Sequence, residues 1–178
     1  VAIDRRWINA GETVTEGVDI GARAGGKVGP GRWLVVLDGS YLLKKKSRIV
    51  ANTPFGPSEV GKFTRAGDLG LRWKHALTGT YSQGPFSATL QNLYRSGYVD
   101  AVLPGVANGS VVPADWNPKV KAYQLWNASV GYAGVKNLTL TVGVKNLLDK
   151  DPPFSAAYDA NTGAGSSWEP RVADPRGR

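Results

Sequence analysis

Residues 137–153 read Asn-Leu-Thr-Leu-Thr-Val-Gly-Val-Lys-Asn-Leu-Leu-Asp-Lys-Asp-Pro-Pro, and this stretch decides the fold class. Apolar residues occupy one parity from Leu138 to Val144, while Thr, Gly and Lys occupy the other parity up to Lys145. This period of two is typical of a β-strand with one apolar and one polar face, because successive side chains point to opposite sides. The sequence therefore predicts a strand that ends at Asp149, before two prolines that cannot continue a ladder.

The same alternation recurs upstream and predicts five further strands. They cover about residues 14–24, 32–44, 68–81, 86–98 and 120–133. The connections alternate in length, with short turns at 25–31, 82–85 and 134–137 and long polar loops at 45–66, 99–119 and 149–170. Strands of about 11–14 residues are long for a globular sheet, where about 5–6 is usual. This pattern predicts an all-β fold, an antiparallel transmembrane β-barrel meander whose apolar parity faces lipid and whose polar parity faces an aqueous lumen.

Aromatic residues gather toward both ends of the predicted strands. Near the short turns lie Trp33, Tyr81, Phe86 and Tyr132, and near the long loops lie Tyr41, Trp73, Tyr94, Tyr98 and Trp126. Membrane barrels carry such girdles at both interfaces. The alternative is a soluble basic β-sheet module that stacks nucleic-acid bases or binds polysaccharide. Against it, most aromatics share parity with Leu, Val and Ala, while Arg and Lys occupy the other face.

Composition limits the class of protein. The chain has 178 residues, a net charge of +8, no Cys and no Met, and it begins with Val1. The lack of Cys excludes disulfide scaffolds, zinc ribbons and thiol catalysis. No apolar run approaches the roughly 20 residues of a membrane helix. We expect a fragment of a longer chain.

Several apparent motifs do not predict a site. Residues 21–27 fit G-x-x-x-x-G-K, but Val28 replaces the Ser or Thr of a phosphate loop and 29–31 cannot open a helix. His75 is the only histidine, so we expect it at the lipid interface rather than in a metal or triad site. The glycosylation sequons at Asn108, Asn127 and Asn137 are interpreted as chance matches, and Asp149, Asp151 and Asp159 as solvated loop residues. The sequence predicts no enzyme, no catalytic residue, no metal and no cofactor.

Two groups of cations are candidate site residues. Arg72, Lys74, Arg95 and Lys145 occupy the polar parity and are predicted to face the lumen, where they could contact a ligand. Lys45, Lys46 and Arg48 follow the second predicted strand at its long-loop end. There they could contact the phosphates of lipopolysaccharide through charge-assisted hydrogen bonds. The alternative for this second group is a solvent-exposed loop that binds no ligand.

Residues 143–153 resemble the G-V-x-N-L-F/L-D-x-x-P-P run near the C-terminus of TonB-dependent receptors, with Leu148 where Phe is frequent. Residues 158–159 and 174–178 resemble the lead into the last barrel strand of that family. Segments that resemble successive earlier strands are 17–19, 72–74, 84–88 and 94–98. The similarity covers nearly the whole chain.

This resemblance implies an outer-membrane transporter of a Gram-negative bacterium that takes up a siderophore–iron complex, cobalamin or a saccharide. Such receptors have a barrel of about 22 strands around a plug. Residues 1–178 would then be a C-terminal part of the barrel domain, about six strands of it, without the plug and the last strand. The implied partners are outer-membrane lipid, lipopolysaccharide, a small-molecule ligand and the TonB energy-transducing complex, which acts through the plug, but not nucleic acid. The short turns would be periplasmic and the long loops extracellular.

Overall fold

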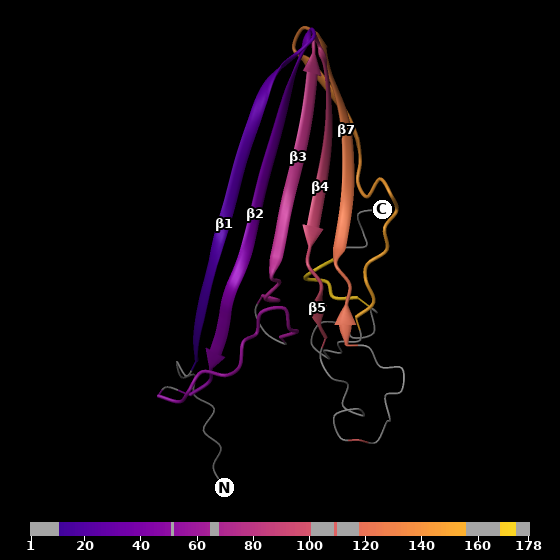
Figure 1. Ribbon diagram of the computed structural model, residues 1–178. Helices are drawn as coiled ribbons and strands as arrows, with labels where there is room; N and C mark the ends of the chain where they lie inside the picture. Colours follow the sequence, from indigo (N-terminus) through magenta and orange to yellow (C-terminus); the bar gives the residue numbers. More distant parts are fainter. Residues whose placement is uncertain are drawn as a thin grey trace.

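The computed structural model describes residues 11–50, 52–64, 68–100, 109, 118–155 and 168–173, and this part of the chain is all-β (Figure 1). Its strands are β1 (Glu12–Val28), β2 (Gly31–Arg48), β3 (Trp73–Gln83), β4 (Phe86–Arg95), β5 (Tyr98–Val99), β6 (Lys119–Val120), β7 (Tyr123–Val135) and β8 (Leu138–Val144). Six of them form one antiparallel sheet in the order β1-β2-β3-β4-β7-β8, and β5 pairs with β6 in a small second sheet. The predicted antiparallel meander is confirmed.

Two-residue turns join the strands at one end of the sheet, at the top of Figure 1. Gly29-Pro30 joins β1 to β2, and Gly84-Pro85 joins β3 to β4. The φ angles of Gly29 and Gly84 are +54° and +55°, a conformation that glycine adopts without steric cost and that tight hairpins require. In the third turn, between β7 and β8, Asn137 has a φ of +63°. The long connections lie at the opposite end.

The strand register assigns each side chain to one of two faces. One row across the sheet is apolar and contains Ala24, Val35, Gly79, Leu90, Ala128 and Val144. The adjacent row on the other face carries three hydroxyl side chains and contains Gly25, Leu34, Thr80, Thr89, Ser129 and Gly143. On that face the Thr80 and Thr89 hydroxyls lie 3.1 Å apart and share a hydrogen bond. The predicted apolar and polar faces are therefore confirmed, and we call them by these names below.

The apolar face is open. The side chains of Phe86, Val130 and Val142 are 62%, 59% and 69% exposed, and no described segment covers them. Monomeric soluble proteins rarely expose a contiguous apolar surface of this extent. The sheet thus needs a non-aqueous environment on this side.

The buried apolar residues lie beyond the long-loop ends of the strands. They form a cluster of Leu69, Tyr98, Val120, Tyr123, Val172 and Ala173. Backbone hydrogen bonds support the cluster, since Phe63 N donates to Val99 O and Val99 N donates to Gly61 O, each at 2.8 Å. Most of these residues come from five segments, 59–64, 68–71, 98–99, 119–120 and 168–173, which we call the cap. The cap is the part of this chain with a core of its own.

The cap explains where the strands differ from the sequence prediction. We predicted that the third strand would begin near Asp68, but β3 begins at Trp73 because Leu69 is buried in the cap. We predicted that the fourth strand would reach Tyr98, yet β4 ends at Arg95. Tyr98 was also predicted to lie in an aromatic girdle, but it is 5% exposed in the core of the cap. An alternating apolar pattern fits a strand in lipid and a segment packed into a small core equally well.

Other boundaries differ as well. The first strand was predicted to end near Ala24, before a turn at 25–31, but β1 continues to Val28 and the turn is Gly29-Pro30. The fifth predicted strand, 120–133, is divided, because β6 ends at Val120 and β7 runs from Tyr123 to Val135. The second strand was predicted to end near Lys44, but β2 continues to Arg48, so Lys45 and Lys46 lie in the strand and not in a loop. The last strand was predicted to end at Asp149, but β8 ends at Val144. Asn146 and Asp149 have φ angles of +52° and +45°, which an extended strand does not adopt. The predicted features at 158–159 and 174–178, and the sequon at Asn108, lie outside the described residues.

Gly97 links β4 to the cap and tests this packing. A Cβ atom at position 97 would overlap the carbonyl oxygen of Val120, a backbone atom that no side-chain rotation can move away. We expect Gly97→Ala to separate β5 from β6 at a cost of about 1–3 kcal/mol. Hydrogen exchange at the amides of Tyr98 and Val99 should become faster. The control is Gly79→Ala, whose Cβ would meet only the Leu90 oxygen at 4.0 Å. Equal exchange rates in the two variants would contradict the assignment.

Candidate functional site

Two rows of aromatic rings border the apolar face. Near the short turns, Trp33 pairs in register with Tyr81, and the rings of Phe86 and Tyr132 are 4.9 Å apart. Near the cap, Tyr41 and Trp73 are 6.3 Å apart and His75 stacks on Tyr94 at 5.3 Å. From Trp73 to Tyr81, β3 rises by about 27 Å, which a tilt of about 40° reduces to about 21 Å. This is close to the apolar band of about 25 Å in membrane barrels.

His75 belongs to the second aromatic row, and its polar atoms have partners there. Trp73 Nε1 donates to His75 Nδ1 at 2.8 Å. His75 Nε2 lies 3.2 Å from Asn92 Oδ1, and Asn92 Nδ2 donates to the Leu125 carbonyl at 3.2 Å. Both ring nitrogens of His75 therefore have hydrogen-bond partners on the apolar face. This agrees with a residue at the membrane interface rather than with a metal ligand.

A hollow of about 480 Å³ lies where the polar face meets the cap. Its charged lining consists of Asp19, Lys45, Asp68, Lys74, Arg95 and Arg171. Four neighbouring strands supply one row of it, in the register order Asp19, Ser40, Lys74, Arg95. Asp19 accepts a hydrogen bond of 2.6 Å from the Ser40 hydroxyl. Six charged side chains line this hollow, and we take it as the candidate site.

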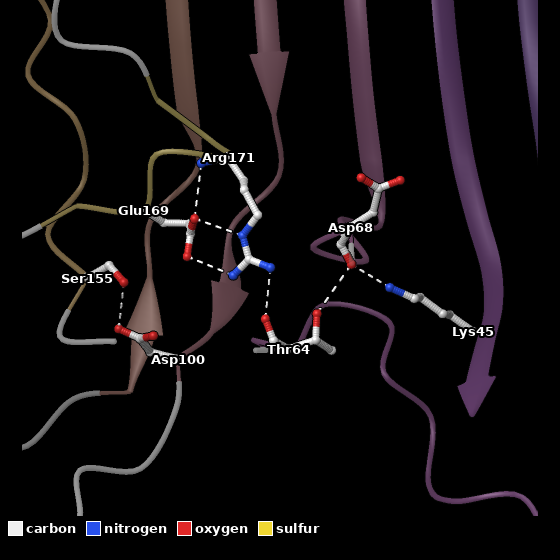
Figure 2. Close-up of polar contacts among 7 residues, drawn as sticks. All are labelled: Lys45, Thr64, Asp68, Asp100, Ser155, Glu169 and Arg171. Carbon is white, nitrogen blue, oxygen red and sulfur yellow. Dashed lines mark hydrogen bonds and ion pairs between the residues drawn. The ribbon is translucent and has the colours of Figure 1, made fainter. Parts of the chain in front are cut away.

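Two of the cap residues that line the hollow are Asp68 and Arg171, and Figure 2 shows their polar contacts. Arg171 forms a bidentate pair with Glu169, with Nε to Oε1 and Nη2 to Oε2 both at 2.9 Å. Arg171 Nη1 also donates to the Thr64 carbonyl at 2.8 Å, and its guanidinium lies 5.2 Å from the Phe63 ring. The pair therefore ties segment 168–173 to segment 59–64, two parts of the chain about a hundred residues apart.

Other polar contacts hold the remaining cap segments. The Thr64 hydroxyl and the Lys45 ammonium both donate to the Asp68 carbonyl (Figure 2). Ser155 Oγ donates to Asp100 Oδ2 at 2.9 Å in a buried contact. Burial raises the pKa of the Tyr98 hydroxyl to about 12, so Tyr98 stays neutral in the core of the cap at any physiological pH.

The structure brings together two of the four predicted lumen-facing cations. Lys74 and Arg95 are direct cross-strand partners on the polar face. Arg72 is not with them, because its guanidinium lies 6.0 Å from the ring of Tyr41, a residue of the apolar face. Lys145 follows the end of β8 and is exposed.

The basic run at the end of β2 divides between the two faces. Lys45 lines the hollow, and its ammonium is 3.9 Å from Glu59 Oε2. Lys46 is the next residue of the strand and so points the other way. Arg48 pairs with Glu12 and lies over the Phe55 ring at 4.8 Å. Whether these residues contact lipopolysaccharide stays a prediction.

Sequence reasoning missed Arg171, Glu169, Thr64 and Asp68 as parts of the site. All of them lie in cap segments, where no periodic pattern or motif marks a residue as facing the hollow. Among the described residues, no group of three or more His, Cys, Asp or Glu could hold a metal ion. No helix in the described ranges is long and apolar enough to cross a membrane.

Comparison with known proteins adds one finding. A family model described as "TonB dependent receptor-like, beta-barrel" matches residues 2–147. This match includes β1 to β8 and every predicted cation of the site. No curated protein and no solved structure matches the chain.

The contact between Arg171 and Glu169 can be tested by substitution. We expect Arg171→Gln to loosen segment 168–173 by about 1–3 kcal/mol, because it leaves a nearly buried carboxylate without its bidentate partner. Faster hydrogen exchange at Val172 and Ala173, whose amides bond to the Glu169 carbonyl, would report this change. In the double variant, Glu169→Gln should lower the stability of segment 168–173 by less than it does alone, because the contact is already lost. Full additivity would contradict the pairing, and Arg72→Gln is the matched control.

Proposed function

Because this chain belongs to the family of TonB-dependent receptor-like β-barrels, we propose that it forms part of the barrel wall of an outer-membrane receptor that takes up a scarce solute. The open apolar face between two aromatic rows is the observation that carries this proposal. Such a face is stable against lipid and unstable against water. The polar face then lines the lumen through which the solute passes.

In this proposal the solute is a siderophore–iron complex, cobalamin or a saccharide, and the cell is a Gram-negative bacterium. The short turns face the periplasm, and the cap with its hollow faces outward. A scarce solute would meet the hollow first. Energy for uptake comes from the TonB complex, which acts through a plug inside the barrel. The chain itself carries out transport and no chemical reaction.

The soluble alternative, a basic sheet that binds nucleic acid or polysaccharide, has less support. A base-stacking sheet needs aromatic rings and cations on the same face. Here Trp33, Tyr81 and Phe86 lie on the apolar face, whereas Lys74 and Arg95 lie on the polar face. The separation of rings from charges favours a wall between lipid and water.

A charge on the apolar face should prevent insertion. In the full receptor, we expect Val130→Arg to cost about 2–4 kcal/mol, because Val130 lies midway along β7 on the proposed lipid side. Ser129→Arg, on the polar face of the same strand, should be nearly neutral. The measurement is the amount of folded, heat-modifiable receptor in the outer-membrane fraction. A wild-type receptor in the soluble fraction would overturn the proposed function, and equal losses in both variants would overturn the assigned faces.

We also propose that the end of β2 contacts lipopolysaccharide. Lys46 and Arg48 lie at the cap end of β2, on the opposite face from Lys45. Lys46→Gln should lower the lipopolysaccharide that co-purifies with the full receptor, because an ammonium that bonds to phosphate is lost. Lys45→Gln removes the same charge from the polar face and should leave co-purification unchanged. If neither variant changes the amount of co-purified lipopolysaccharide, these cations are exposed to solvent and do not contact it.

A further inference from the structure

A second hollow, of about 630 Å³, adjoins the candidate site on the polar face. The two hollows share one row of the sheet, and the second hollow extends into the next row toward the short turns. The polar-face residues of its lining are Asp19, Ser40, Lys74 and Arg95 in the shared row and Gly21, Asp38, Ala76 and Leu93 in the next row. Its two carboxylates balance its two cations, so this second hollow has no excess of either charge.

The two signs of charge lie on different strands. Both carboxylates come from β1 and β2, at Asp19 and Asp38, and both cations come from β3 and β4, at Lys74 and Arg95. Neighbouring strands lie about 4.8 Å apart, so the row from Asp19 to Arg95 spans about 14 Å. A molecule that lies across the strands therefore meets negative charge at one end of the second hollow and positive charge at the other.

Two of these four charged side chains already have a polar partner. Asp19 accepts the hydrogen bond from Ser40, and Arg95 donates to a backbone carbonyl of the cap. Among the described residues, the side chains of Asp38 and Lys74 form neither an ion pair nor a hydrogen bond. These two are diagonal neighbours on β2 and β3, with Cα atoms about 7–8 Å apart. The second hollow therefore offers one carboxylate and one ammonium group, close together and both available to a ligand.

Apolar carbon lies beside these two charges. Ala76 is the register partner of Asp38, and Leu93 is the register partner of Ala76. The next row toward the short turns carries Thr78 and Gln91 on the same two strands, so the apolar pair interrupts the polar face. Contact with Ala76 and Leu93 would remove an apolar group of a ligand from water, which is favourable.

We propose that the second hollow binds a zwitterionic group with an adjoining apolar part, such as an amino acid or the end of a peptide-like solute. The ammonium of the ligand pairs with Asp38, its carboxylate pairs with Lys74, and its apolar part covers Ala76 and Leu93. A ligand with only one charge leaves the other side chain unpaired, and a neutral ligand leaves both unpaired. This inference rests on the proposed transport function and specifies which chemical group of the solute this wall recognises.

The probes are leucine and two analogues that each lack one of its charges. The analogue 4-methylpentanoate lacks the ammonium, and 3-methylbutylamine lacks the carboxylate, while both keep the apolar part. Each probe is titrated against the full-length receptor in detergent, and its dissociation constant is measured by saturation-transfer NMR. We expect leucine to bind at least fivefold more tightly than either analogue. Leucine that binds no more tightly than both analogues would overturn the proposal.

Substitution separates the two contacts. Asp38→Asn should bind leucine no more tightly than 4-methylpentanoate, because the partner of the ammonium is lost. Lys74→Gln should bind leucine no more tightly than 3-methylbutylamine, because the partner of the carboxylate is lost. The control is Lys27→Gln, which removes a cation from the same face outside the second hollow and should keep all three wild-type affinities. Leucine affinity that neither variant changes would overturn the assigned residues.

Thermal unfolding without a probe separates ligand binding from a structural role. Asp38→Asn, Lys74→Gln and the double variant should all melt at the wild-type temperature, because no contact between the two side chains is lost. Lower melting temperatures that are not additive in the double variant would show a direct ion pair instead, and would overturn the proposal. A receptor that fractionates with the outer membrane yet shows no preference for leucine loses only the zwitterion assignment. A receptor in the soluble fraction would instead overturn the transport function.

Discussion

The need to pair every backbone N–H and C=O group with a neighbouring strand governs this structure. Hydrocarbon offers no hydrogen-bond partner, and each unpaired group inside it costs several kcal/mol. The sheet meets this need with antiparallel ladders from β1 to β8, joined at one end by two-residue turns. β1 and β8 are the edges of the described sheet. In the proposed receptor both edges pair with further barrel strands, since an open edge is not stable within a bilayer.

Because the ladders pair the backbone within the sheet, one face can contact lipid while the other contacts water. Alternation sends Val130 and Val142 to one side and Ser129 and Thr141 to the other. The apolar side needs no covering element if lipid covers it, which is why the buried residues of the chain gather in the cap rather than against the sheet. The cap stabilises itself as a small soluble domain would, through a few buried side chains and bonds such as that from Arg171 to Glu169.

The polar face is also uneven in charge. Its middle carries neutral hydrogen-bonded side chains, such as Asn127, which donates to Gln91 at 3.0 Å. Charged side chains lie toward both ends. Asp19, Lys74 and Arg95 share a row near the cap, and Lys27 and Arg32 share the row nearest the short turns.

The sequence by itself determined the class of fold, the two faces of each strand and the existence of the three short turns, although the first turn is shorter than the predicted 25–31. These features are local, because a period of two and a Gly-Pro or Lys-Asn turn are visible within about ten residues. It also assigned the polar parity of Lys74 and Arg95. Only the tertiary structure decided that these two are direct partners, since register depends on turn length and a shift of one residue moves every side chain to the other face. The same holds for Leu69, Tyr98 and Arg171, whose contacts join segments far apart in the chain, where no local pattern records which segment will be the neighbour.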